Sequence, residues 1–253
     1  MLHVQQRAGV TVLRMEHGKV NVLDLELLTL LAETMDGLTD AAVVLTGTGS
    51  SFSAGVDLRR IVNSDARHTD AFLSALSRAL LAVFRHPRPV VAAMNGHAIA
   101  GGCVLAAAAD ARLMSGGSIG LTELRVGVPF PTAAVEIVRY AVGSATHPLA
   151  MFAELLDPQQ AHAMGLVHRL CPPGRLLEDA VEWAGRLAAI APETFALTKR
   201  QLHAPAETLI AERTERDDAD VHRQWTDTGG RAAMASFLEG LDRAARQRVS
   251  SAG

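Results

Sequence analysis

The sequence predicts an α/β fold with a helical C-terminal part. Short apolar strand patterns alternate with amphipathic helix patterns over the first two thirds of the chain, and only helix patterns follow Pro192. In the central stretch Val90–Asp110, a strand, a turn, a glycine pair and an Ala-rich helix follow one another directly. Alternating strands and helices are typical of a sheet covered by helices. The change near Ala191–Pro192 is the best candidate for a boundary between this core and the helical region.

Each element expected in the N-terminal third has its own apolar period and boundary residues. Short apolar runs indicate strands, and apolar residues three and four positions apart indicate helices. Asp24 is a typical helix-capping residue, and Pro87 and Pro89 end a helix. The expected elements are a strand over Val10–Met15, a helix over Leu25–Leu38, a strand over Ala42–Thr46, a long loop over residues 47–58 and a helix over Thr69–Arg85.

The stretch Val90–Asp110 combines a buried strand with a helix that glycines open. Val90–Met94 is apolar throughout, and Asn95-Gly96 is a typical turn pair. The glycine pair Gly101-Gly102 lets a ligand approach the backbone, and the first N–H groups of a helix are free donors at its positive end. The stretch is therefore a candidate site for standing or developing negative charge. Close packing of helix on strand would explain the same glycines.

The elements expected after Asp110 are inferred in the same way, and Gly and Pro residues mark the breaks between periodic segments. The expected elements are a strand over Ala111–Met114, an extended piece over Ser118–Leu121, an irregular segment over Glu123–Pro131, a helix over Thr132–Tyr140, a short helix over Pro158–Gly165, a strand over Val167–Leu170, and helices over Leu176–Ala189, Pro192–Leu202, the polar segment Glu207–Asp220 and Arg231–Arg246.

Composition excludes several classes of function. The formal net charge of -3 argues against nucleic acid or an acidic membrane surface as the main partner. The two cysteines, Cys103 and Cys171, have no metal-ligand neighbours at short spacing, which argues against a zinc site or a disulfide framework. Met1–Gly18 lacks a signal-peptide pattern, and no apolar run reaches the ~20 residues of a membrane span. We expect a cytoplasmic protein without a membrane span.

Three motifs in order resemble the crotonase (enoyl-CoA hydratase/isomerase) superfamily. They are Phe52–Leu58, Asn95–Cys103 and Ile119–Glu123, and the resemblance covers Val10–Arg246. It implies a spiral of ββα units followed by a helical part that serves assembly into a homotrimer or a dimer of trimers. The expected division is residues 1–190 for the spiral core with an acyl-CoA site and residues 191–253 for the trimerisation region.

The resemblance also implies a site for an acyl-CoA thioester, in which coenzyme A is part of the substrate and no separate cofactor or metal is needed. Two backbone N–H groups, matched to Val56 and Gly101, would hold the thioester oxygen in an oxyanion hole. Fixed donors of this kind stabilise an enolate in a dry pocket. The residues matched to CoA binding are Ala54, Val56, Asp57 and Arg59, and those expected near the acyl chain are His97, Leu121, Pro129 and Phe130. A structural role for His97, and a solvated one for Arg59, are alternatives.

The residues matched to catalysis favour one reaction of the superfamily. The hydratases use two glutamates, but here the first position is Val104 and only the second, Glu123, is a carboxylate. Valine cannot hold or deprotonate water, whereas a single base can move a proton from C2 to C4 of a 3-enoyl thioester. Ala100–Val104, Ile119–Glu123 and Asp218–Val221 look like the mitochondrial-type Δ3,Δ2-enoyl-CoA isomerases.

Alternatives remain open from the sequence. The same oxyanion hole could serve weak hydratase, hydrolase or decarboxylase activity, because one fold hosts many reactions. A protein that binds acyl-CoA without turnover is a further reading, favoured if Glu123 points away from the pocket. Glu136 is the second candidate base, although a position on a helix surface or behind the site explains it more simply. Burial of Glu123 would raise its pKa and make it a better base for a carbon acid.

Overall fold

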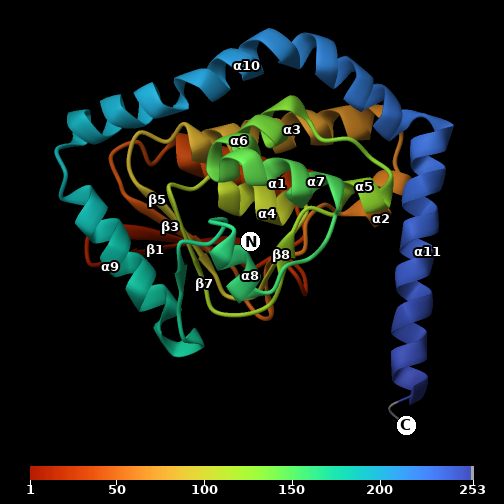
Figure 1. Ribbon diagram of the computed structural model, residues 1–253, viewed down its shortest axis with the longest axis horizontal. Coiled ribbons are helices and arrows are strands. Elements are labelled where there is room, and N and C mark those ends of the chain that lie inside the picture. Colours follow the sequence, from red (N-terminus) through yellow and green to blue (C-terminus); the bar gives the residue numbers. More distant parts are fainter. Residues whose placement is uncertain (252–253) are drawn as a thin grey trace.

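A six-stranded sheet forms one side of the core in this computed structural model, which describes the backbone of residues 1–251 and the side chains of residues 1–247. Its strand order is β1-β2-β3-β5-β7-β9, and all neighbours run parallel except β1 and β2 (Figure 1). The strands are β1 (Leu2–Arg7), β2 (Val10–Met15), β3 (Val43–Thr46), β5 (Val90–Met94), β7 (Ala111–Met114) and β9 (Arg169–Leu170). The α/β fold expected from the sequence is confirmed.

A second, smaller sheet contains β4 (Ser51–Ser53), β6 (His97–Ile99) and β8 (Ile119–Gly120), all parallel. Each of its strands directly follows a strand of the large sheet, so that β3-β4, β5-β6 and β7-β8 each begin a ββα unit. These are the units of the expected spiral. The sequence did not indicate β4 or β6, because three residues are too few to show a period of two.

Helices cover both faces of the large sheet. On one face lie α1 (Leu25–Asp36), α3 (Ala66–Phe84), α4 (Gly101–Ala107) and α6 (Thr132–Val142). On the other face, α9 (Leu176–Ala188) packs on the central strands, and its residues Ala180 and Ala184 lie against them (Figure 1). The Asp24 carboxylate accepts a hydrogen bond from the N–H of Leu27 at 2.8 Å, so the expected cap of α1 is confirmed.

One strand was missed and two local expectations were wrong. Strand β1 was not expected, because it is a polar edge strand whose residues are almost all exposed. The segment Glu123–Pro131 was expected to be irregular, yet Glu123–Val126 forms the short helix α5, which Gly127 ends at φ +87°. The two segments Pro192–Leu202 and Glu207–Asp220 are one helix, α10 (Pro192–Thr226), which continues through Pro205. Packing of α10 on α3 and α6 stabilises it in spite of the hydrogen bond that proline cannot make.

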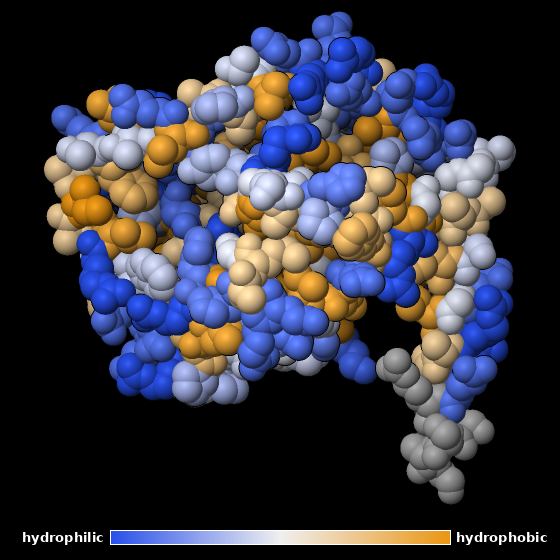
Figure 2. Space-filling model, in the orientation of Figure 1, coloured by the Kyte–Doolittle hydropathy of each residue, from blue (hydrophilic) through white to orange (hydrophobic). Residues whose placement is uncertain are grey.

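The C-terminal helices α10 and α11 (Thr228–Ser251) wrap two sides of the core. Helix α10 arches over α3 and α6, and α11 then descends beside α2 (Leu58–Val62) and α5 (Figure 1). Apolar residues follow the side of α11 that faces the body, among them the buried Met234 and the partly buried Phe237 (Figure 2). The remaining helices are α7 (Thr146–Met151) and α8 (Pro158–Ala163). No helix within the described residues is both long enough and apolar enough to cross a membrane.

Helix α4 packs so closely on β4 that its second residue must be glycine. A Cβ atom on Gly102 would lie 2.4 Å from the backbone oxygen of Ser53, a contact that only a backbone shift could relieve. We predict that Gly102→Ala lowers the free energy of unfolding by about 1–3 kcal/mol, the usual cost of overpacking. Urea unfolding followed by circular dichroism measures this change.

Gly185→Ala in α9 is the matched control, because a Cβ atom there would meet no atom within 4 Å. This substitution should leave stability unchanged or raise it by up to about 1 kcal/mol, since alanine is the better helix former. Equal effects of the two substitutions would contradict the packing argument.

Candidate active site

The three parallel strands of the small sheet end beside one another, and each leads into one residue of the expected site. Strand β4 leads to Val56, β6 to Gly101 and β8 to Glu123. The sheet pairing extends one residue beyond β6, where the N–H of Ala100 donates to the C=O of Gly120 at 2.8 Å. The small sheet therefore brings together segments that lie far apart in the sequence.

The backbone N–H groups of Val56 and Gly101 lie outside the hydrogen bonds of their own elements. Val56 forms a parallel bridge with Leu23. The hydrogen bonds of this bridge run from the N–H of Leu23 to the C=O of Gly55 (2.8 Å) and from the N–H of Asp57 to the C=O of Leu23 (3.1 Å), so they do not use the N–H of Val56. Gly101 is the first residue of α4, and the first N–H groups of a helix have no acceptor within it. Within residues 1–247, both amides are therefore available to an external acceptor.

The segments that carry these two amides touch each other. A Cβ atom on Gly55 would lie 2.7 Å from the backbone oxygen of Ile99 and 3.5 Å from the backbone nitrogen of Gly101. A Cβ atom on Gly101 would lie 3.6 Å from Cγ2 of Val56. Ala100 adopts φ +54° and ψ -124°, a conformation that costs a non-glycine residue about 1–3 kcal/mol. The strain accompanies the sharp turn from β6 into α4.

Glu123 begins α5 and is enclosed by the protein. The residue is 8% exposed, and its Oε2 atom meets no hydrogen-bond partner in the described part of the chain. Burial raises the pKa of the carboxyl to about 7, because loss of water disfavours the charged form. The backbone amides of Thr122 and Glu123 partly oppose this rise. A carboxyl with this pKa can both accept and release a proton near neutral pH.

The segment that leads to Glu123 lies beside the start of α4, because β8 pairs with β6 and the N–H of Ala100 donates to the C=O of Gly120 at 2.8 Å. Cys103, two residues after Gly101, is buried, and the pKa of its thiol is raised first by burial and then by the negative charge of Glu123. The start of α4 and the segment that leads to Glu123 therefore lie at the same edge of the small sheet.

The other candidate positions for an acid or base carry no free carboxylate. Val104 is 1% exposed and packs within the main core. Glu136 is 2% exposed, but its carboxylate is held by two guanidinium groups, those of Arg139 at 3.0 Å and Arg213 at 3.5 Å. The carboxylate of Glu136 is occupied by two cations, whereas Oε2 of Glu123 has no partner among the described residues. Glu123 is thus better suited to proton transfer than Glu136.

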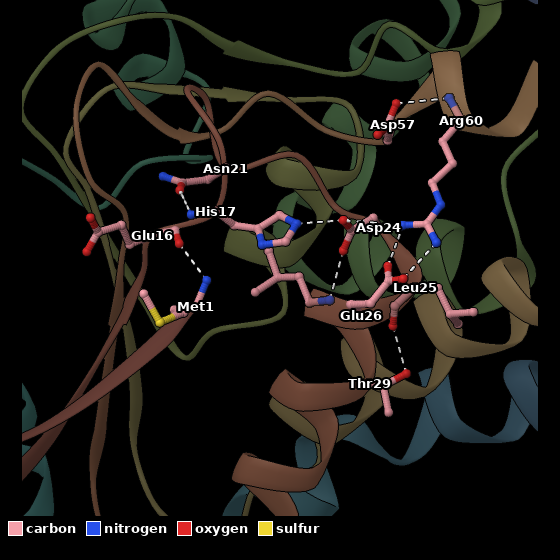
Figure 3. A network of polar contacts seen from close by, with 11 residues as sticks. Met1, Glu16, His17, Asn21, Asp24, Leu25, Glu26, Thr29, Asp57 and Arg60 are labelled. Atoms are coloured by element: carbon pink, nitrogen blue, oxygen red, sulfur yellow. Dashed lines mark hydrogen bonds and ion pairs between the residues drawn. The ribbon is translucent and has the colours of Figure 1, made fainter.

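The residues matched to CoA binding lie on the segment that leads into α2. The N–H of Ala54 donates to the C=O of Val20 at 3.0 Å, which holds this segment on the loop before α1. Asp57 caps α2 by accepting from the N–H of Arg60 at 3.0 Å. The guanidinium of Arg60 in turn binds the Glu26 carboxylate at 2.5 and 2.6 Å (Figure 3). This polar network fixes α2 against the start of α1.

Helix α11 ties the end of α2, with Arg59, to the segment that follows Glu123. The Arg59 guanidinium, expected from the sequence to reach a CoA phosphate, forms an exposed ion pair with Asp242 of α11. Arg231 donates to two carbonyl groups at the end of α2, at 3.2 and 2.7 Å. At the end of α5, Ala233 of α11 packs directly on Gly127. A Cβ atom on Gly127 would lie 2.7 Å from the Cβ atom of Ala233. A phosphate contact of Arg59 stays a prediction, and it would compete with Asp242.

The structure separates the four residues expected near the acyl chain. Pro129 and Phe130 line a hollow of about 680 Å³ bounded by α5, α6 and α7. Leu121 is buried in the main core. The imidazole of His97 is hydrogen-bonded through Nδ1 to the hydroxyl (2.9 Å) and the N–H (3.1 Å) of Ser118, in the segment that leads into β8. This is the environment of a structural histidine, and neither His97 nor Leu121 is among the described residues that line the hollow.

Two residues of α10 hold the loop that follows α5, a role that the sequence did not reveal. The carboxylate of Asp218 accepts from the N–H (2.8 Å) and the hydroxyl (2.6 Å) of Thr132 at the start of α6. The indole N–H of Trp225 donates to the C=O of Pro129 at 2.9 Å. No local pattern could indicate these contacts, because the partners lie far apart in the chain. They fix both ends of the Pro129–Thr132 turn beside Glu123.

Comparisons with known proteins agree with this architecture. The model of the family described as "Enoyl-CoA hydratase/isomerase" matches residues 5–247. A Thermus thermophilus protein named "Putative enoyl-CoA hydratase" is 35% identical over 210 residues, which are 80% of this chain and 83% of that protein. The human protein named "Enoyl-CoA delta isomerase 1, mitochondrial" is 29% identical over 224 residues, which are 85% of this chain and 73% of that one.

Solved structures give the same answer. The crystal structure of human mitochondrial delta3-delta2-enoyl-CoA isomerase matches with a TM-score of 0.89 at 25% identity and covers 96% of this chain and 98% of that one. A structure from Mycobacterium tuberculosis, titled as a probable enoyl-CoA hydratase, matches with a TM-score of 0.82 at 27% identity and covers 88% of this chain and 96% of that one. The chain has the crotonase fold and belongs to the enoyl-CoA hydratase/isomerase family.

Proposed function

We propose that the protein moves a double bond in an acyl-CoA thioester, as a Δ3,Δ2-enoyl-CoA isomerase does. The observation that carries this proposal is the carboxyl of Glu123, which is buried, has a raised pKa and carries an Oε2 atom without a hydrogen-bond partner among the described residues. Val104 occupies the position at which the hydratases of this family would have a second glutamate. One acid/base group is enough for a proton shift within the substrate, but adding water requires a second group to hold the water.

In the proposed reaction, the ionised Glu123 removes a proton from C2 of a 3-enoyl thioester. The electrons of the C–H bond pass into a dienolate, and the negative charge develops on the thioester oxygen. The protonated carboxyl then returns the same proton to C4, and the double bond moves to C2–C3. A pKa of about 7 suits both halves of this transfer, because the group exchanges a proton near neutral pH without a large penalty in either direction.

The amides of Val56 and Gly101 are proposed to bind the thioester oxygen through both steps. Both donate from fixed backbone, so they need no reorganisation when the charge develops, and each such donor contributes about 2.7–4 kcal/mol to the transition state. The dipole of α4 adds positive potential at the same end. Among the described residues no cation forms an ion pair with Glu123 and its Oε2 atom has no hydrogen-bond partner, so the base is not neutralised.

A hydratase is the second candidate, favoured by the name of the Thermus thermophilus relative. Hydration would need Glu136 or another group to replace the carboxylate missing at Val104. Glu136 is held by Arg139 and Arg213, which argues against this role. Hydrolase or decarboxylase activity and binding without turnover are outcomes of the same test.

The first test offers a 3-enoyl-CoA and follows the ultraviolet absorbance of the conjugated 2-enoyl thioester. Glu123→Gln should lower kcat by about 10²–10⁴-fold, the usual contribution of a positioned acid/base group. Glutamine keeps the size and hydrogen-bonding capacity of the side chain but cannot take the proton. Glu136→Gln is the matched control, and it should change kcat by less than an order of magnitude.

Three results would contradict the proposal. Full turnover by the Glu123→Gln variant would remove Glu123 from the mechanism. Faster consumption of 2-enoyl-CoA by water addition than of 3-enoyl-CoA by isomerisation would favour the hydratase. Tight binding of both thioesters by the native protein without any turnover would identify an acyl-CoA-binding protein.

The pH dependence of kcat/KM should report the ionisation of Glu123 in the free enzyme. Because the base acts in its charged form, kcat/KM should rise about tenfold per pH unit below pH 7 and level off above it. Stopped-flow assays between pH 5 and pH 9 measure the profile. A profile that stays flat from pH 5 to pH 9, as expected for a carboxyl with the ordinary pKa of 4.5, would show that the base is not the buried group.

The same pKa shift predicts a cost in stability. The folded state favours the protonated carboxyl, so the stability that this preference supplies is present below pH 4.5 and is lost as the pH rises through about 7. The shift corresponds to roughly 3 kcal/mol when the group is fully ionised. The free energy of unfolding of Glu123→Gln minus that of the native chain should therefore increase from pH 5 to pH 8, as measured by urea unfolding. A constant difference over this range would contradict the assignment of the raised pKa.

A further inference from the structure

A cavity of about 680 Å³ lies at the opposite end of α4 from the proposed active site. It is bounded by the end of α4, by α6, and by α9 and α10, which converge on this side of the core (Figure 1). Helix α4 runs from Gly101 to Ala107, so its length alone separates the cavity from the Gly101 amide by roughly 10 Å. No residue assigned above to the acyl-CoA site lines this cavity among the described residues.

The charged groups that line the cavity do not cancel. Lys199 is 7% exposed, and its ammonium contacts the Asp110 carboxylate at 2.9 Å. Arg112 is 4% exposed, and its guanidinium donates to neutral groups, the backbone oxygens of Leu166 (2.7 Å) and Ala109 (2.9 Å) among them. Asp110 is the one carboxylate among the described lining residues, so two cations face one anion.

The two histidines of the lining do not change this balance. Burial lowers the pKa of His168 to about 4, and the neighbouring positive charge of Arg112 adds to the effect. Burial likewise lowers the pKa of His203 to about 4, with Lys199 contributing in the same direction. Both rings are therefore neutral at pH 7. The lining keeps an excess of one positive charge in a poorly hydrated environment, where charge is costly unless a counter-charge is supplied.

The rest of the cavity wall is apolar and largely aromatic. Phe84, Tyr140, Trp183, Phe195 and Leu202 line it, and the His203 ring stacks on Phe84 with 3.7 Å between the ring centroids. Ligand sites in proteins typically combine such apolar walls with a few charged groups that fix orientation. The wall suits the body of a small organic molecule, and the excess charge suits an anionic end group.

We propose that this cavity binds a small organic monocarboxylate. Its carboxylate approaches the ammonium of Lys199 and supplies the negative charge that balances Arg112, whose guanidinium contacts only neutral groups among the described residues. Its apolar body packs against Trp183 and Phe195. One negative charge balances the lining, whereas a neutral molecule of the same shape leaves the excess charge uncompensated. The site is separate from the proposed acyl-CoA site, so its occupation does not depend on the proposed reaction.

The two tryptophans of the chain allow a direct test with octanoate as the probe. Trp183 lines this cavity, whereas the indole N–H of Trp225 donates to Pro129, which lines the hollow beside α5. Fluorine NMR of the full-length protein labelled with 5-fluorotryptophan gives one signal for each. Octanoate should shift the Trp183 signal to saturation and leave the Trp225 signal unchanged. Octan-1-ol, with the same chain but no charge, should bind at least tenfold more weakly.

Two substitutions test the site itself. Lys199→Met removes one cation and should weaken octanoate binding about tenfold or more. Because this change also leaves Asp110 without its partner, Ala141→Phe provides a second variant, which fills the cavity without altering charge. Ala150→Phe, which fills the hollow beside α5, is the matched control. Ala141→Phe should abolish the Trp183 response, and Ala150→Phe should preserve it.

Several outcomes would overturn the proposal. They are a Trp183 signal that does not respond to millimolar octanoate, equal binding of octan-1-ol, a response confined to Trp225, and a response that survives Ala141→Phe. Burial of Trp183 against a second copy of the chain, detected as a concentration-dependent shift of its signal without octanoate, would identify a subunit contact in place of the ligand.

Discussion

The small parallel sheet is the constraint on which the candidate site depends. Glycine is required just before two of its strands, because the neighbouring backbone is very close there. A Cβ atom on Gly96 would lie 2.0 Å from the backbone oxygen of Ser50, and one on Gly117 would lie 2.5 Å from the backbone nitrogen of His97. With larger residues the strands would move apart, and the segments of Val56, Gly101 and Glu123 would separate. The chemistry rests on backbone positions as much as on side chains.

Two buried glutamates show how differently one fold treats the same side chain. Glu136 is neutralised by Arg139 and Arg213, and so it adds a charge network between α6 and α10. Glu123 has no such partner in residues 1–247, and its burial opposes ionisation. A buried carboxyl without a counter-ion destabilises the folded state, which is a common cost of keeping a group reactive. Burial of apolar side chains in the main core offsets that cost.

The sequence predicted the parts of the fold that have a clear local period. Strands β2, β3, β5 and β7 and helices α1 and α3 follow apolar patterns several residues long, and Asp24 marks the start of α1. Strands β4 and β6 escaped prediction because their stability comes from pairing with each other across a long stretch of chain. The residues Val56, Gly101 and Glu123 were found through family resemblance, since no local pattern shows that their segments meet. The cavity around Lys199 could not be foreseen, because its walls come from elements far apart in the sequence, from the end of α3 to α10.

The placement of α11 has a consequence for biosynthesis. Arg231 and Asp242 attach it to α2, and Ala233 seats it on Gly127 at the end of α5. Both sheets consist of residues that precede α10, so they can assemble on the ribosome while the α11 segment is still inside the exit tunnel. Nascent chains can therefore reach the correct topology before they have the outer wall that joins α2 to α5, and the segments around the candidate site are tied together only after α11 has left the ribosome.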